Sequence, residues 1–473
     1  MRAPLIETSH GEPSATISTN EPKQFDWPLA YEAEQLIRQR IETFLENNSF
    51  AACLAARMQN ETGTDFFEWI DHLVLSPDDE TGLRKAGFVN EKVDTAGGEI
   101  ALHHPRATLP RVLLRSNGKQ NPAVIALRPE WIADFLHANN LTATPEGEPF
   151  SRYRCVLIAS ENGTRLEAVE RHAYLGYVPA PLKNDELKYI VNAKELWRTR
   201  KRQFSEAAEG FVLANNVLDE SMKLVGRDLS CEFYFTEERA YWEKRNHAAR
   251  IQKRRQDTLG LGWGNHDHHT FRSSREHFVD LIAFLVRLGL EKRERYYAGS
   301  EAGWGAQISE QPVVGIVVFA DVDLMPDETK IDFSSIRLAP APELGTVGLW
   351  IGLHGESFLD AGMHHLEARF DFALLRDQLK EEGINTMNPF SNFEFLRQAF
   401  TEGERWKVSA ERAKKLLDVK LITPEQSEKF LREGAIGSHL ENLQRRGGFK
   451  GFNQKSVSVI IAGTDPRKQH FAA

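Results

Sequence analysis

One arrangement of secondary structure recurs along this chain: a strand, then a helix, then several further strands. The spacing of apolar residues predicts it twice between residues 69 and 174 and twice more between residues 268 and 407. One such unit leaves an apolar sheet face uncovered, so it must pair with a second to close a core. The predicted fold class is therefore α+β, with paired βαβββ modules forming cupped mixed sheets in two halves. A cup of this kind leaves a cavity where a small-molecule site belongs.

A chain of 473 residues is too long for one core, and its charge pattern changes along its length. The stretch from 183 to 257 is charged and has helical periodicity, which predicts a helical connector between the two halves. We expect a disordered tail (1–24), an N-terminal domain (25–180), the connector (181–260), a catalytic domain (261–408) and a helical C-terminal segment or lid (409–473). Residues 346–353 are predicted as a strand and residues 438–444 as a helix.

The composition narrows the class of function. Hydrophobic residues make up 41% and charged residues 27% of the chain, which is a globular balance. The net charge of −9 argues against nucleic-acid binding, and the longest apolar runs are too short for a membrane helix. The three cysteines are far apart in the sequence and predict no disulfide framework. We expect a cytoplasmic protein with a small carboxylate substrate, and a homodimer is compatible with the sequence.

Histidine is concentrated in the second half, at the first strand of each repeat. His268 is followed four residues later by Arg272, and His365 four residues later by Arg369. Residues four apart in a strand share a face, so each unit can send one imidazole and one guanidinium into the same cavity. The neighbours His269 and His364 should point the other way, unless a bulge intervenes.

A carboxylate would complete a metal site with these two histidines. Glu402 lies on the expected last strand of the second unit, and Glu404 shares its face, so the pattern leaves the choice open. Two imidazoles and one carboxylate leave three positions open on a divalent ion, an arrangement suited to Fe(II) that binds substrate and O2 together. Mn, Co or Zn could occupy the same donors. Arg272 or Arg369 would hold a substrate carboxylate by a two-pronged contact.

These residues resemble the vicinal oxygen chelate superfamily, whose paired modules bind metal through two His and one Glu. More closely, the stretch from residue 262 to 417 resembles the 2-oxoadipate dioxygenase/decarboxylase family, also called 2-hydroxyglutarate synthase. The similarity is carried by His268-x-x-x-Arg272, by His365-Leu366-x-x-Arg369 and by the run from Phe400 to Arg405. It implies His268, His365 and Glu402 as iron ligands and Arg272 as the carboxylate-binding residue. It also implies oxidative decarboxylation and hydroxylation of a 2-oxo acid, with O2 as co-substrate.

Two other functions stay open from the sequence. One is an isomerase, lyase or hydrolase that uses the metal as a Lewis acid without O2. The other is a non-enzymatic small-molecule binding protein.

Two further segments carry predictions. The Gly- and Lys-rich run 447–456 is either a lid, with Lys450 or Lys455 contacting a distal carboxylate, or a surface loop. In the first half, Asp71-His72 falls where a ligand would sit. The matching strand, residues 123–128, has no histidine, so that half is predicted to be a degenerate, non-catalytic cup.

Overall fold

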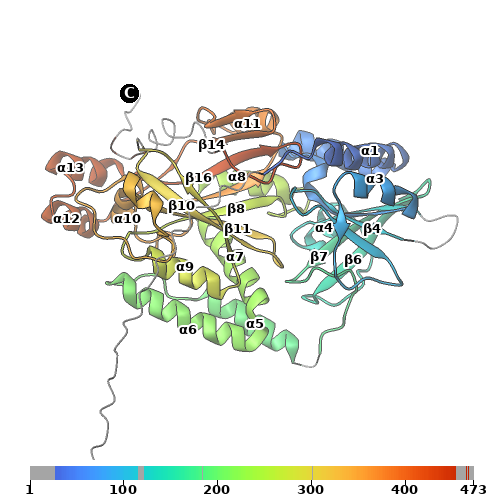
Figure 1. Ribbon diagram of the computed structural model, residues 1–473, viewed down its shortest axis with the longest axis horizontal. Coiled ribbons are helices and arrows are strands. Elements are labelled where there is room, and N and C mark those ends of the chain that lie inside the picture. Colours follow the sequence, from blue (N-terminus) through green and yellow to red (C-terminus); the bar gives the residue numbers. More distant parts are fainter. Residues whose placement is uncertain are drawn as a thin grey trace, which may run out of the picture.

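The computed structural model describes residues 27–115, 122–183, 185–300 and 302–453, together with Asp465 and Arg467. The predicted tail, Lys455 and the predicted last strand (457–462) therefore lie outside the described residues. Two mixed sheets form the two halves, and long helices from the middle of the sequence run beneath the second (Figure 1). The α+β class predicted from the sequence is confirmed.

The first half is one seven-stranded sheet in the order β2-β3-β4-β1-β5-β7-β6. Antiparallel pairing of β1 with β5 joins a βαβββ unit to a βαββ unit that is one strand shorter. Residues 31–57 form two helices rather than one, because Asn48 caps the second through its side chain. The elements are α1 (Tyr31–Asn47), α2 (Ser49–Arg57), β1 (Ile70–Leu75), α3 (Glu80–Lys85), β2 (Val89–Asn90), β3 (Ile100–His103), β4 (Arg111–Leu114), β5 (Ala123–Leu127), α4 (Ile132–Ala138), β6 (Tyr153–Glu161) and β7 (Thr164–Arg171).

The connector is helical, as its charge pattern predicts. It contains α5 (Glu186–Arg198), α6 (Ala207–Val225), α7 (Arg227–Lys244) and α8 (His247–Asp257). Helix α7 is buried over much of its length, because its aromatic residues pack against the second half.

The second half is a nine-stranded sheet whose main path runs β13-β14-β16-β12-β8-β11-β10-β9, with β15 paired to β16. A βαβββ unit and a second one that carries the short extra strand β15 meet where β8 pairs antiparallel with β12. The first unit holds β8 (His266–Arg272), α9 (Phe278–Arg287), β9 (Glu291–Tyr297), β10 (Trp304–Gln311) and β11 (Ile316–Asp323). The second holds β12 (His365–Arg369), α11 (Phe372–Glu381), β13 (Ser391–Phe393), β14 (Leu396–Phe400), β15 (Glu404–Trp406) and β16 (Ala435–Arg445). Helices α10 (Thr346–His354), α12 (Ala410–Asp418) and α13 (Pro424–Glu433) lie outside this pattern.

Two predictions of secondary structure are wrong. Residues 346–354 form helix α10 rather than a strand; they are apolar on nearly every side, so periodicity could not separate the two. Residues 435–445 form strand β16 rather than a helix. Both faces of β16 are buried, which removes the alternation typical of a strand, and Leu440 and Leu443 imitate helical spacing.

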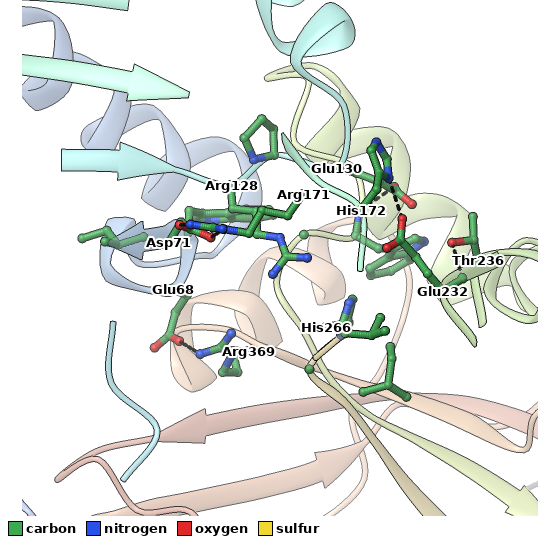
Figure 2. A pocket seen from close by; sticks show the side chains of 18 of the residues that line it. Glu68, Asp71, Arg128, Glu130, Arg171, His172, Glu232, Thr236, His266 and Arg369 are labelled. Atoms are coloured by element: carbon green, nitrogen blue, oxygen red, sulfur yellow. Dashed lines mark hydrogen bonds and ion pairs between the residues drawn. The ribbon is translucent and has the colours of Figure 1, made fainter. Parts of the chain in front are cut away.

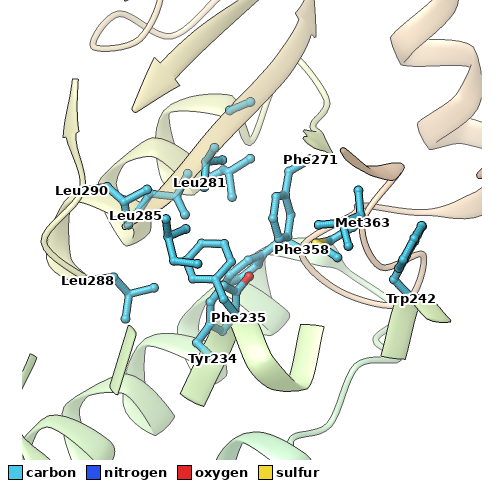
Figure 3. Close-up of a cluster of buried hydrophobic side chains, with 14 of the residues drawn as sticks. Tyr234, Phe235, Trp242, Phe271, Leu281, Leu285, Leu288, Leu290, Phe358 and Met363 are labelled. Carbon is cyan, nitrogen blue, oxygen red and sulfur yellow. The ribbon is translucent and has the colours of Figure 1, made fainter. Parts of the chain in front are cut away.

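The largest core lies between the second sheet and the helices that cover it. Figure 3 shows Tyr234 and Phe235 of α7, Phe271 of β8 and Leu281 and Leu285 of α9 in one cluster. Their burial fixes β8 against α7 and α9 from behind, so the opposite face of β8 is free to line a cavity. Along the described residues, no helix combines the length and the apolar character that crossing a membrane requires.

Candidate metal centre

Three ionisable side chains form a row across neighbouring strands of the second sheet. Glu367 of β12 pairs in register with His268 of β8 on one side and with Glu441 of β16 on the other. Their ligand atoms all lie within 4.8 Å of one another, and all three residues are buried. Among the described residues this is the one group of three such side chains with the spacing of a metal site.

A fourth donor, His365, faces the same point. Its Nε2 lies 3.3 Å from Glu367 Oε1 and 3.6 Å from Glu441 Oε2. The Nε2 of His268 is in close contact with Glu367 Oε1. Meanwhile Oε2 of Glu367 and Oε2 of Glu441 are buried without a hydrogen-bond partner. Two carboxylate oxygens left unpaired beside two imidazoles fit a divalent cation, which would satisfy all of them at once.

Side chains behind these donors fix their orientation. Asp267 Oδ1 lies 3.0 Å from His268 Nδ1, which turns the Nε2 of that ring toward the cluster. Arg445 donates two hydrogen bonds to the same Asp267, of 3.0 and 2.9 Å. Gln398 donates to Glu441 Oε1 at 2.9 Å and leaves Oε2 facing the cluster. Such second partners are typical of metal-binding histidines and carboxylates.

Burial controls the protonation of the cluster. It lowers the pKa of His268 to about 4, and it holds the pKa of His365 well below its usual value, so both imidazoles are neutral. Burial also raises the pKa of Glu441 to about 7. The pKa of Glu367 lies well above its usual value because of burial and the neighbouring charge of Glu441. Neutral imidazoles present free lone pairs, which is the form that binds a metal ion.

The cluster lies in a small pocket with mainly aromatic walls and a cavity of about 60 Å³. The pocket is lined by His268, Thr270, Arg272, Tyr296, Trp304, Phe319, Asp321, His364, His365, Glu367, Phe390, Gln398, Phe400, Glu441, Phe452 and Asn453. Arg272 therefore shares a face with His268, as the spacing of four predicts. The predicted lid segment also reaches this pocket, since Phe452 packs on the ring of His268 at 5.1 Å.

Arg272 is the cationic group of the pocket. It is 4% exposed, and its guanidinium lies 5.5 Å from the centre of the Trp350 ring. Its Nε has no hydrogen-bond partner, and no carboxylate lies within ion-pair distance among the described residues. Burial lowers the pKa of Arg272 to about 10 and raises that of Asp321 to about 7. A buried, unpaired guanidinium is costly unless an anion joins it, so this pocket favours an anionic ligand.

The structure does not bring the other predicted residues to the cluster. Glu402 is exposed and accepts a hydrogen bond from Asn385 at 3.2 Å. Glu404 accepts from the backbone of His247. Arg369 lies at the end of β12, 3.3 Å from Glu68 and outside the pocket.

Lys450 also lies outside this pocket, paired with Glu310 at 2.9 Å, and Lys455 is not among the described residues. The histidine neighbours behave differently from each other. His269 points away and packs on Phe235, as expected. His364 lines the pocket, with its Nδ1 at 2.7 Å from that of His365, since it precedes the regular part of β12.

The sequence pattern did not indicate two carboxylates of the cluster, those of Glu367 and Glu441. Glu367 lies two residues after His365, so strand alternation alone could have placed it on the same face. Glu441 was not found because its strand was predicted as a helix, which left the run 400–405 as the apparent last strand of the module. In the first half, Asp71 forms a two-pronged ion pair with Arg171 and a 2.7 Å contact with His72.

No protein-family model matches the chain, and no curated protein matches it. Solved structures do. A protein assigned as a hydrolase from Shewanella frigidimarina is 13% identical over 48% of this chain and 98% of its own, with a TM-score of 0.34. A protein assigned to the glyoxalase superfamily from Ralstonia eutropha is 11% identical over 56% of this chain and 97% of its own, with a TM-score of 0.31. A variant of 4-hydroxymandelate synthase from Streptomyces coelicolor is 13% identical over 85% of this chain and 98% of its own, with a TM-score of 0.26. The paired βαβββ architecture itself rests on the strand order described above.

Proposed function

We propose that the second half is a metal-dependent enzyme of the vicinal oxygen chelate type, and that it is an Fe(II)-dependent dioxygenase acting on a small 2-oxo acid. The observation that carries the proposal is the convergence of four metal donors and one unpaired guanidinium in a single buried pocket.

The metal would be held by His268, Glu367 and Glu441, with His365 as the fourth donor. Two neutral imidazoles and two carboxylates carry a combined charge of −2, which a divalent ion neutralises. Four protein donors leave open positions on a six-coordinate ion, and such positions are needed for substrate and O2. When bound, Fe(II) would supply the oxygen chemistry, whereas Zn or Mn would supply Lewis-acid chemistry.

Arg272 would bind the carboxylate of the substrate. It lies four residues after His268 on one face of β8, so a carboxylate on the guanidinium places the adjoining carbons beside the metal donors. The cavity of about 60 Å³ limits the acid to a small one in this conformation. Asp321, with a pKa of about 7, is a third acidic group in the pocket, beside Glu367 and Glu441, and it can hold a proton there.

The aromatic walls would keep water from the reacting groups. Tyr296, Trp304, Phe319, Phe390 and Phe400 surround the donors, and Phe452 closes one side. A dry pocket would strengthen the contact between Arg272 and a carboxylate and exclude solvent from the bound substrate.

Substrate-dependent O2 uptake tests this function. The full chain is purified without oxygen, its metal content is measured, and O2 consumption is followed against a panel of 2-oxo acids. We expect one iron per chain and uptake with at least one short acid. Arg272→Met should keep the iron and lose the uptake, while Arg369→Met, which lies outside the pocket, serves as the matched control.

Two results would change the conclusion. Full metal content with turnover of an acid but no O2 consumption would favour the Lewis-acid isomerase, lyase or hydrolase. Ligand binding that is equally tight in metal-free protein, with no turnover, would favour a binding protein.

A further inference from the structure

A second pocket lies where the first sheet, the connector and the second sheet meet. Its cavity, about 310 Å³, is larger than that of the metal pocket, and none of its lining residues belongs to the metal pocket. Figure 2 shows side chains from the three parts around it, including Arg128, Arg171, Glu232, His266 and Arg369. A cavity of this size suits a small organic ligand.

Most charges of this pocket are neutralised by each other. Arg171 pairs with Asp71 at 2.8 Å, and Arg369 with Glu68 at 3.3 Å. His172 lies 2.6 Å from Glu232. Arg111, which also lines the pocket, pairs with Glu91 at 2.6 Å. These pairs hold the walls together and leave no net charge to attract a ligand.

Two lining cations, Arg128 and Lys194, have no such partner among the described residues, and a third, Arg239, has only a long one. Arg128 makes no side-chain hydrogen bond or ion pair with any described residue. Lys194 lies 4.9 Å above the ring of Trp131 and forms no ion pair with a described carboxylate. Arg239, whose side chain is 9% exposed, is 3.9 Å from the nearest oxygen of Glu130.

Arg239 is the most deeply buried of the three cations. Its other contacts are neutral: His269 Nε2 at 3.3 Å and Thr236 Oγ1 at 3.3 Å. Its Nε has no partner. Glu130 also accepts a hydrogen bond from the backbone of Trp263 at 3.0 Å, so its charge is shared. The carboxylates that attract Arg128, those of Asp71 and Glu232, already pair with Arg171 and His172. Glu130 is left for both Arg239 and Lys194. Burial makes this excess of positive charge costly unless an anion joins it.

We propose that this interdomain pocket binds a small dianion through Arg128, Lys194 and Arg239. Carboxylate and phosphate groups are the ligands that guanidinium groups recognise best. Aromatic side chains of Trp69, Trp131, Trp263 and Phe233 line the same cavity and would pack on the apolar part of the molecule. The site stands independently of the proposed oxygenase, although its floor includes His266 and Arg369, on the two strands that carry the metal cluster.

Calorimetric titration of the full, metal-free chain tests this site, with inorganic phosphate and glutarate as separate probes. We expect one binding event for at least one probe, and the probe that binds identifies phosphate or carboxylate as the preferred group. Arg239→Met and Arg128→Met should each weaken it about 10- to 100-fold. Arg128 is only half-buried, so its variant keeps the test valid if Arg239→Met fails to fold.

The variant Arg272→Met distinguishes this site from the metal pocket. It should bind the probe as tightly as the wild-type chain does. The proposal is overturned if neither probe binds the wild-type chain at millimolar concentration. It is equally overturned if binding is lost in Arg272→Met but persists in folded Arg239→Met and Arg128→Met, as shown by circular dichroism.

Discussion

Replacing Glu441 by Gln distinguishes the structural assignment of the metal ligands from the one that the sequence suggests. The substitution Glu441→Gln removes one charge and one oxygen donor but hardly changes the size of a side chain that is fully buried. The hydrogen bond from Gln398, 2.9 Å long, can persist because the new amide keeps one acceptor oxygen. The effect should therefore come from the donor set and not from packing.

The expected loss follows from the position of Glu441 beside Glu367 and His365. Removing a residue that only supports a ligand lowers metal affinity about 10- to 100-fold. Glu441 offers its own unpaired Oε2 to the cluster, so its loss should exceed about 100-fold, or about 2.7 kcal/mol. Without metal, the variant should melt no lower than wild type, because the change removes a like charge from a buried carboxylate pair.

Equilibrium dialysis of chelator-stripped protein against Fe(II) without oxygen, followed by elemental analysis, measures the affinity. Glu402→Gln is the matched control, since Glu402 is exposed and bonded to Asn385, and it should bind metal as wild type does. Wild-type affinity in Glu441→Gln together with lost affinity in Glu402→Gln would refute the structural assignment.

Three further predictions concern the surroundings of the site and the core. Asp267→Asn should weaken Fe(II) binding about 10- to 100-fold in the same dialysis, because Asp267 orients His268 at 3.0 Å; unchanged affinity would contradict that role. Phe284→Ala should lower the free energy of unfolding in urea by about 3–5 kcal/mol, since the ring is fully buried against Phe358 at 4.5 Å, whereas the exposed Val286→Ala should cost little. Burial alone would lower the pKa of His172, but the carboxylates of Glu232 and Glu170 outweigh it and raise that pKa to about 9. The stabilisation, about 3 kcal/mol, should be fully present below about pH 6.5 and be lost as the pH rises through about 9. In His172→Gln, the free energy of unfolding in urea should not show this loss between pH 6 and pH 10. An equal fall in the free energy of unfolding in both proteins would exclude His172 as the source.

Local patterns were sufficient for most elements of this fold. The Asn162-Gly163 turn between β6 and β7 and the Thr423 cap of α13, with Gln426 reaching back to it, are formed by neighbours in the sequence. The spacing of His268 and Arg272 likewise predicted their common face, because strand alternation is a property of the chain itself.

The grouping of His268, Glu367 and Glu441 depends on long-range strand pairing, which no local sequence pattern encodes. Strand β16 is buried on both faces and exists because β12 and β14 pair with it, so its local propensity was overruled by long-range hydrogen bonds. That pairing sets Glu441 beside Glu367, while Arg369, at the end of β12, lines the other pocket. The sequence by itself predicted the paired modules and the common cavity of His268, His365 and Arg272. Only the tertiary structure decided which carboxylates join them, because strand order and register bring together residues more than 70 positions apart.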